Sequence, residues 1–298
     1  MDDQNYKIYR HKELPINICH FTTLPSTQIW AYENIDFLIN TEKLSPNTWT
    51  VITADNMTSG IGSYDHKTRT PRTWYTLNGK NLNATYLALR RREISEELEK
   101  NASDLSLYTL GIALSVCKIL GEFGIKDPKI KWVNDIYVNG KKIGGILTKQ
   151  LEKRYVFEQV EYEPIVIGIG LNVLHDKYDL PENIESPATS IKIESELDSS
   201  FIGINDILEI LHLEVIKSVT NINSSRNRGF QDNTLAEVNK RLLYKGKVVK
   251  IIDYEKEGNE IEMGVLQGVD KNGFAIIKLP EINGGELKIS HGRIKFDG

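Results

Sequence analysis

The segment DIYVNGKKIGG, residues 135–145, places a carboxylate, two lysines and two glycines around an Asn-Gly pair. Asn-Gly favours a two-residue type I′ hairpin turn, because both central positions of that turn need positive φ. Paired residues of a hairpin share a face, and the expected pairs are Val138 with Lys141, Tyr137 with Lys142, Ile136 with Ile143, and Asp135 with Gly144. One face is then apolar, with Lys141 near its tip and solvated. The other face carries Lys142 beside the carboxylate of Asp135 and the bare backbone of Gly144. This arrangement indicates that Lys142 is a cation that binds a ligand, and an ordinary solvated surface is the alternative.

A second chemical feature is the run IVIGIGLNV, residues 165–173. Read as a strand, its odd positions form an unbroken apolar face, whereas its even positions include Gly168, Gly170 and Asn172. Glycine inside a strand often marks the close approach of a ligand or of another part of the chain. The pattern therefore predicts a floor for a flat ligand, with close packing of a helix on that face as the alternative.

Two loops complete the set of candidate positions. The segment TSGIGSYDHKTRTPRTW, residues 58–74, offers glycine backbone that an anion can approach, and the basic side chains Lys67, Arg69 and Arg72. An ordinary surface loop is the alternative reading. In PSTQ, residues 25–28, Ser26 or Thr27 is expected to cap a helix, and a helix N-terminus can also hold polar ligand atoms.

The elements that must position these residues follow from apolar periodicity. Helices are expected to begin near residue 26 and to cover 104–124 and 201–222, and strands to cover 49–57, 81–90 and 163–173. From about residue 244, short β-rich runs separated by turns predict a small barrel or sandwich. The expected class is α+β, with a mixed-sheet domain at 1–238 and a small β domain at 239–298.

Composition narrows the function classes. The chain has 298 residues and a net charge of −4, so the charge argues against binding to nucleic acid or to an anionic membrane. The N-terminal segment lacks the apolar core of a signal peptide, and no run in the sequence is expected to approach the roughly 18 apolar residues needed to span a bilayer. Cys19 and Cys117 lie far apart in the sequence, as free thiols of a cytoplasmic protein would.

The central motif KWVNDIYVNGKKIGGIL, residues 131–147, closely resembles the signature of biotin protein ligases, which is Lys-Trp-Pro-Asn-Asp, a hairpin, then Lys-x-x-Gly-Ile-Leu. Val133 replaces the proline. STQ resembles the family's Ser-Thr-Asn, SGIG its Gly-Arg-Gly loop, and GIGLNV its Gly-x-Gly-x-Asn strand. The likeness runs from about Thr22 to the C-terminus, where the β-rich segment resembles the family's SH3-like domain. A DNA-binding winged helix is not expected before these motifs. Departures are Ile61 between the loop glycines, Met57 where glutamine is common, and no tryptophan after Asn172.

The resemblance implies an ATP-dependent reaction in which biotin is activated as biotinyl-5′-AMP and then transferred to a lysine of a carboxylase acceptor domain. Lys142 would be the cation near the biotin carboxylate and the α-phosphate, and Asp135 would orient the attacking lysine or accept its proton. Mg²⁺ would neutralise the leaving pyrophosphate. The implied phosphate and adenylate contacts are Arg69, Arg72, Asn134, Lys142 and Asn172. The implied biotin contacts are Ser26, Thr27, Gln28, Met57, Gly60, Gly62, Trp74, Lys142, Gly144, Gly168 and Gly170.

Two other functions remain open at this point. A lipoate–protein ligase has the same fold and adenylate chemistry but needs a long apolar slot for its substrate. A non-catalytic module that binds an adenylate or an acceptor is the second alternative. The sequence is compatible with a monomer or a homodimer.

Overall fold

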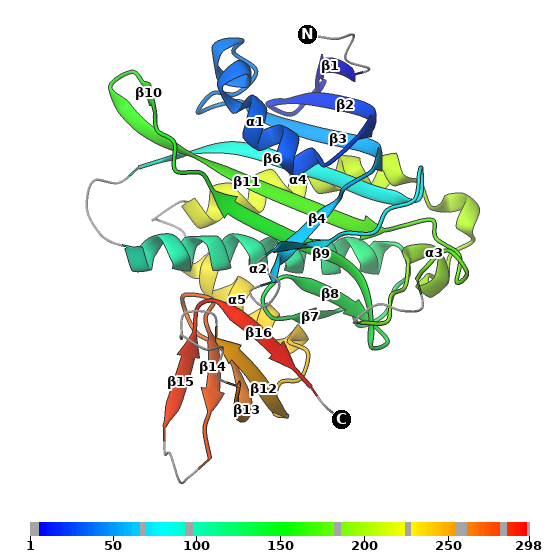
Figure 1. Cartoon of the computed structure of the whole chain (residues 1–298), viewed down its shortest axis with the longest axis vertical. Coiled ribbons are helices and arrows are strands. Elements are labelled where there is room, and N and C mark those ends of the chain that lie inside the picture. The colour runs from blue at the N-terminus through cyan, green and yellow to red at the C-terminus, as the bar shows by residue number, and fades with distance from the viewer. Residues whose placement is uncertain are drawn as a thin grey trace.

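The computed structural model describes residues 6–65, 70–92, 98–181, 186–223, 228–253, 261–280 and 285–296. Its main body is a nine-stranded mixed sheet with the order β1-β2-β3-β6-β11-β9-β8-β7, and β10 pairs with β11 (Figure 1). Only β2 and β3 run parallel within this described sheet. Its strands are β1 (Tyr6–Arg10), β2 (Ile16–Leu24), β3 (Trp49–Met57), β6 (Asn81–Arg91), β7 (Lys129–Lys131), β8 (Asp135–Val138), β9 (Lys141–Gln150), β10 (Tyr155–Phe157) and β11 (Val160–Asn172). The mixed-sheet fold expected from the sequence is confirmed.

Helices cover both faces of the sheet. Along β11, Ile165, Ile167 and Ile169 point into the larger apolar core under α2 (Leu98–Glu122) and α4 (Ile204–Asn223), whereas Val166 joins the smaller core under α1 (Thr27–Asn40). This alternation is the period of two that a strand between two layers requires. The glycines of β11 therefore lie on the face that α1 covers.

The expected start of α1 is confirmed. Ser26 is the N-cap, and its hydroxyl accepts a hydrogen bond from the backbone N–H of Ile29 at 3.4 Å. This bond satisfies one of the N–H groups that a helix leaves unpaired at its first turn. The cap fixes the direction in which the next two residues, Thr27 and Gln28, face the sheet.

The central helix differs from the expectation in two ways. It begins at Leu98 rather than near residue 104, and its segment Leu105–Glu122 is long and apolar enough to cross a membrane by length and composition. The expectation that no apolar run reaches that length is therefore wrong. Most of this segment is buried inside the protein, where it packs against α4 and β9. Its apolar character is explained by its place in the core.

The hairpin β8–β9 has the expected turn but a different register. Asn139 and Gly140 both have positive φ, as a type I′ turn requires. Tyr137 pairs with Lys142 as expected, but Asp135 pairs with Gly145 and Ile136 with Gly144, because a β-bulge inserts Ile143 as an extra residue. The predicted pairings of Asp135 with Gly144 and of Ile136 with Ile143 are therefore wrong. Ile136, Val138 and Ile143 are nevertheless all buried, as expected for the core face.

The C-terminal part is a five-stranded antiparallel sheet with the order β15-β14-β13-β12-β16, as expected for an SH3-like domain. Its strands are β12 (Val248–Asp253), β13 (Ile261–Val269), β14 (Ala275–Lys278), β15 (Glu286–Ile289) and β16 (Gly292–Lys295). It is tied to the main body by a hydrogen bond from the indole N–H of Trp132 to the carbonyl of Gly273, at 3.0 Å. The proposed boundary at 238/239 falls inside α5 (Arg228–Arg241), where Asn239 bonds the end of β13 at Val269.

Shorter elements complete the described chain. The strands β4 (Ile61–Asp65) and β5 (Thr70–Thr73) form a two-stranded hairpin of their own that lies over the main sheet (Figure 1). The helix α3 (Ile191–Glu194) and a 3-10 turn at Ser199–Phe201 precede α4.

Candidate functional site

A cavity of about 210 Å³ lies between the N-terminus of α1, the β4–β5 hairpin and the face of the main sheet. Most of the residues that the sequence singles out line it, although they come from segments far apart in the sequence. They are Ser26, Thr27, Gln28, Met57, Gly62, Arg72, Trp74, Asn134, Asp135, Lys142, Gly168, Gly170 and Asn172. Gly60 and Gly144 are described but lie outside the lining, and Arg69 and Lys67 lie outside the described residues.

One end of the cavity is charged. The ammonium of Lys142 is 2.6 Å from a carboxylate oxygen of Asp135, and their side chains are 28% and 18% exposed. The bulge places Gly145, not Gly144, beside this pair, because a Cβ at Gly145 would lie 3.5 Å from the Lys142 ammonium. The prediction that Gly144 gives clearance on this face is therefore wrong by one residue, and a Cβ there would meet Leu171 instead.

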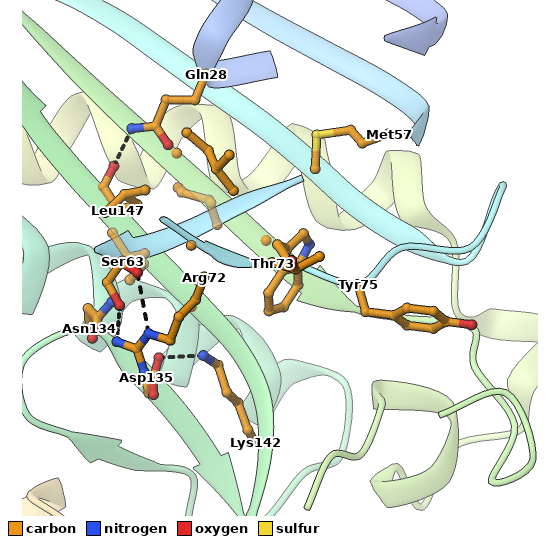
Figure 2. A pocket seen from close by; sticks show the side chains of 18 of the residues that line it. Gln28, Met57, Ser63, Arg72, Thr73, Tyr75, Asn134, Asp135, Lys142 and Leu147 are labelled. Carbon is orange, nitrogen blue, oxygen red and sulfur yellow. Dashed lines mark hydrogen bonds and ion pairs between the residues drawn. The ribbon is translucent and has the colours of Figure 1, made fainter. Parts of the chain in front are cut away.

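Arg72 reaches the same end from the β4–β5 hairpin. Figure 2 shows its guanidinium gathered with Asn134, Asp135 and Lys142, at the opposite side of the cavity from Gln28 and Met57. Its Nε donates to the carbonyl of Ser63 at 3.3 Å, and a terminal nitrogen donates to the Ser63 hydroxyl. Ser63 stands across the hairpin and fixes the plane of the guanidinium. The sequence offered no sign of this serine's role, because the contact depends on the hairpin register.

The other end of the cavity is closed and polar. Ser26, Thr27, Gln28 and Thr85 are all buried there. The Thr85 hydroxyl donates to that of Thr27 at 2.9 Å, and the Gln28 amide donates to the carbonyl of Leu147 at 3.0 Å. The backbone N–H and the hydroxyl of Thr27 point at the sulfur of Met57, at 3.5 and 3.7 Å. A thioether is a weak acceptor, so a ligand oxygen would be a better partner for these two donors.

The glycines of β11 allow side chains to lie flat on the sheet. A Cβ at Gly170 would lie 2.6 Å from the indole of Trp74, and one at Gly168 would lie 2.7 Å from the Gln28 side-chain oxygen. The two readings of this glycine face, a floor for a ligand and close packing of a helix, each hold in part. Gly168 packs against Gln28 of the helix α1, and Gly170 packs against Trp74, which lines the cavity. The indole N–H of Trp74 donates to Asn83 at 3.3 Å, which fixes the ring in its plane.

The two asparagines expected at the adenylate end have different surroundings. Asn134 lines the cavity, and its carbonyl accepts from the backbone of Ile146 at 2.8 Å. Asn172 is buried and its amide is engaged by the protein, because it accepts from Asn81 at 3.0 Å and donates to the carbonyl of Thr189 at 2.9 Å.

Other lining residues were not found from the sequence. Arg293 reaches the cavity from β16 of the C-terminal sheet, and Leu180, Pro181 and Ser186 border it from the segment after β11. A lone arginine in a β-rich segment carries no local signal of a distant site. Its contribution depends on how the C-terminal sheet docks on the main body.

The geometry suits a ligand with a polar ring, an apolar stem and an anionic end. Buried hydroxyl and amide groups can orient the ring, the glycine-floored sheet and Trp74 can hold the stem, and cations collect where the anion would lie. Cations fixed in a half-buried site stabilise charge that develops on a phosphorus atom more strongly than they would in water.

Comparisons with known proteins agree with this geometry. The family model described as the biotin/lipoate A/B protein ligase family matches residues 42–172. A relative, the bifunctional ligase/repressor BirA of Bacillus subtilis (strain 168), is 32% identical over 142 residues, which are 48% of this chain and 38% of that protein. The chloroplastic biotin–protein ligase 1 of Arabidopsis thaliana is 47% identical over 47 residues, 16% of this chain and 11% of that protein. The chain thus spans less than two fifths of the length of these relatives.

Solved structures extend the likeness to most of the chain. The biotin protein ligase from Aquifex aeolicus in complex with biotin and ATP has a TM-score of 0.64, with 93% of this chain and 97% of that chain covered. The apo form of the Aquifex protein gives 0.62, with 94% and 98% covered. At 23% and 21% identity these likenesses concern the fold. The resemblance inferred from the sequence is confirmed: residues 42–172 match the biotin/lipoate A/B protein ligase family model, and the chain has the fold seen in the biotin protein ligase from Aquifex aeolicus.

Proposed function

We propose that the protein is an ATP-dependent ligase that activates biotin as biotinyl-5′-AMP and joins it to a lysine of a carboxylase acceptor domain. The observation that carries this proposal is the order of groups along the cavity, from buried hydroxyls and amides to the Lys142–Asp135 pair. Biotin has the matching order of a ureido ring, an aliphatic chain and a carboxylate. The names of the relatives, which are ligases, support the same reaction.

In the first step, a carboxylate oxygen of biotin attacks the α-phosphorus of ATP. The bond between this phosphorus and the oxygen bridging to the β-phosphate breaks, and pyrophosphate leaves with that oxygen. Negative charge gathers on the α-phosphoryl group as the step proceeds, and Lys142 with Arg72 would stabilise it. Ser63 holds the Arg72 guanidinium at the end of the cavity where this charge would lie.

In the second step, the amine of an acceptor lysine attacks the acyl carbon of biotinyl-5′-AMP. An amide bond forms, the acyl C–O bond breaks, AMP leaves, and the amine loses a proton. Asp135 is the one carboxylate among the described residues of the cavity lining, so we assign to it the orientation of the lysine or the acceptance of this proton.

The described residues form no site of their own for Mg²⁺. No group of three or more His, Cys, Asp or Glu side chains among them could hold a metal ion, and Asp135 is already paired with Lys142. A magnesium ion is often held mainly by substrate phosphates and water. In this protein it would arrive with ATP, and the steps above are assigned to the chain's own residues.

The closed end of the cavity favours biotin over lipoate. A dithiolane ring has no oxygen to replace the weakly accepting Met57 sulfur as partner of the two Thr27 donors, whereas a ureido ring has a carbonyl oxygen that could. The test is ATP–pyrophosphate exchange by the purified protein with biotin or lipoate as the acid. Exchange that requires biotin is expected. Exchange with lipoate alone would show that the protein is a lipoate–protein ligase instead, and no exchange with either acid would refute the proposal.

A further inference from the structure

Two buried asparagines lie two residues apart on β6 and make different contacts. Asn81 and Asn83 are 2% and 4% exposed, and their spacing puts both side chains on the same face of the strand. Asn83 accepts from the indole of Trp74 at 3.3 Å. Asn81 accepts from the backbone N–H of Leu77 at 2.8 Å and donates to Asn172 at 3.0 Å. Asn81 is not among the described residues that line the cavity.

From Asn81, a continuous chain of hydrogen bonds leads to Lys142. Asn172, which accepts from Asn81, donates to the carbonyl of Thr189 at 2.9 Å. The N–H of Thr189 donates to the carbonyl of Lys142 at 2.9 Å, and the N–H of Lys142 donates to the carbonyl of Pro187 at 2.7 Å. Asn81, Asn172 and Thr189 are all buried, so water does not compete for these bonds.

Lys142 needs such support because it is paired on one side only, with Tyr137 of β8, and the neighbouring strand β11 does not reach it. The pairing of β9 with β11 ends at Gly144 and Leu171, and the bulge at Ile143 interrupts the pairing with β8 next to Lys142. Beyond the end of β11, the segment 187–189 lies beside β9 instead. It pairs with β9 through a parallel bridge between Lys142 and Ala188. This segment belongs to no strand or helix of its own, and Asn172 anchors it to the end of the sheet.

We infer that Asn81 is a positioning residue for the reaction, which acts through Asn172 and the segment 187–189 to fix the backbone of Lys142. The inference rests on the proposed function in giving Lys142 the role of the cation at the α-phosphate. It also changes the part assigned to Asn172, whose amide holds the 187–189 segment. Loss of the donor at residue 81 frees that segment, and the ammonium of Lys142 loses its fixed place beside Asp135.

The test compares Asn81→Leu with Asn83→Leu, two changes of similar size on one strand and one face. In biotin-dependent exchange, Asn81→Leu is expected to lower kcat by about 10- to 100-fold, because a misplacement of about 1 Å costs on the order of 100-fold. Its KM for biotin should change less than its kcat, since the end of the cavity that would hold the ureido ring lies apart from Lys142. Asn83→Leu should do the reverse, raising KM for biotin through Trp74 and leaving kcat close to wild type.

A second variant and a second readout keep the inference falsifiable. Asn81→Asp keeps the acceptor for Leu77 and replaces the donor to Asn172 with a carboxylate oxygen, so it is used in place of Asn81→Leu should that variant fail to fold. Hydrogen exchange should show faster exchange at the amides of Lys142 and Thr189 in either Asn81 variant, and not in Asn83→Leu. Unchanged amide protection, or an unchanged kcat in a folded Asn81 variant, would overturn the inference. The amide readout needs no activity, so it separates this inference from failure of the proposed function.

Discussion

Replacement of Gly170 by alanine tests whether Trp74 forms the wall of the biotin site. The added Cβ would lie 2.6 Å from one carbon of the indole ring, and ordinary contacts begin at 3.4 Å. The ring must therefore move by about 0.8 Å or more, which also breaks its 3.3 Å bond to Asn83. Overpacking of this kind costs about 1–3 kcal/mol, and a hydrogen bond adds about 1 kcal/mol. A loss of 1.4 kcal/mol in binding corresponds to about tenfold in affinity.

The expected result for Gly170→Ala is a rise of about tenfold or more in KM for biotin, because the Trp74 ring is displaced from the position in which it lines the cavity. The assay is ATP–pyrophosphate exchange measured against biotin concentration, together with the thermal unfolding midpoint. Gly121→Ala is the matched control, since a Cβ at that helical glycine meets nothing within 4 Å. It should leave KM unchanged and stabilise α2 slightly. A normal biotin KM in Gly170→Ala would refute the assignment of Trp74 and the glycine floor to the biotin site.

Three further predictions concern charge. Lys142→Ala should lower the rate of ATP–pyrophosphate exchange by at least about 100-fold without lowering the unfolding midpoint. Lys141→Ala, at the exposed neighbouring position, should leave the exchange rate unchanged. Equal exchange rates in the two variants would contradict the role of Lys142 as the cation at the α-phosphate. Arg72→Lys should raise KM for ATP about tenfold, because lysine cannot make both bonds to Ser63; an unchanged KM would remove Arg72 from the phosphate site. Burial lowers the pKa of His212 from 6.5 to about 4, so the unfolded chain binds a proton that the folded chain does not. Stability should then fall as pH drops from 6.5 to 4, by about 1.4 kcal/mol per unit from this group, and urea unfolding of His212→Asn should show a shallower pH dependence than wild type.

Much of the site could be predicted from local sequence because its chemistry sits in short motifs. Asn139-Gly140 fixed the turn, and the alternation of β11 placed Gly168 and Gly170 on one face. The cap at Ser26 followed from the residue types at a helix start. Each of these inferences needs only neighbours along the chain, where turn and strand geometry are well defined.

Other features depend on contacts between distant segments, which periodicity does not reveal. Because of the bulge at Ile143, Gly145 rather than Gly144 pairs with Asp135. The bulge lies next to Lys142, whose backbone bonds the segment 187–189 instead of β11. Arg293 enters the cavity only because the C-terminal sheet docks beside it. The long apolar helix α2 is predicted from its periodicity as a core element, but composition gives a buried core helix and a membrane span the same appearance, and only its packing inside the protein distinguishes them.

The most direct test of the central claim is transfer of label to an acceptor. The purified protein is incubated with ATP, radiolabelled biotin or radiolabelled lipoate, and a biotinyl acceptor domain whose target lysine is intact or replaced by arginine. The account predicts covalent labelling from biotin alone, only of the acceptor with the intact lysine, and only when ATP is present. Labelling from lipoate alone, or no labelling from biotin by the folded protein, would contradict it.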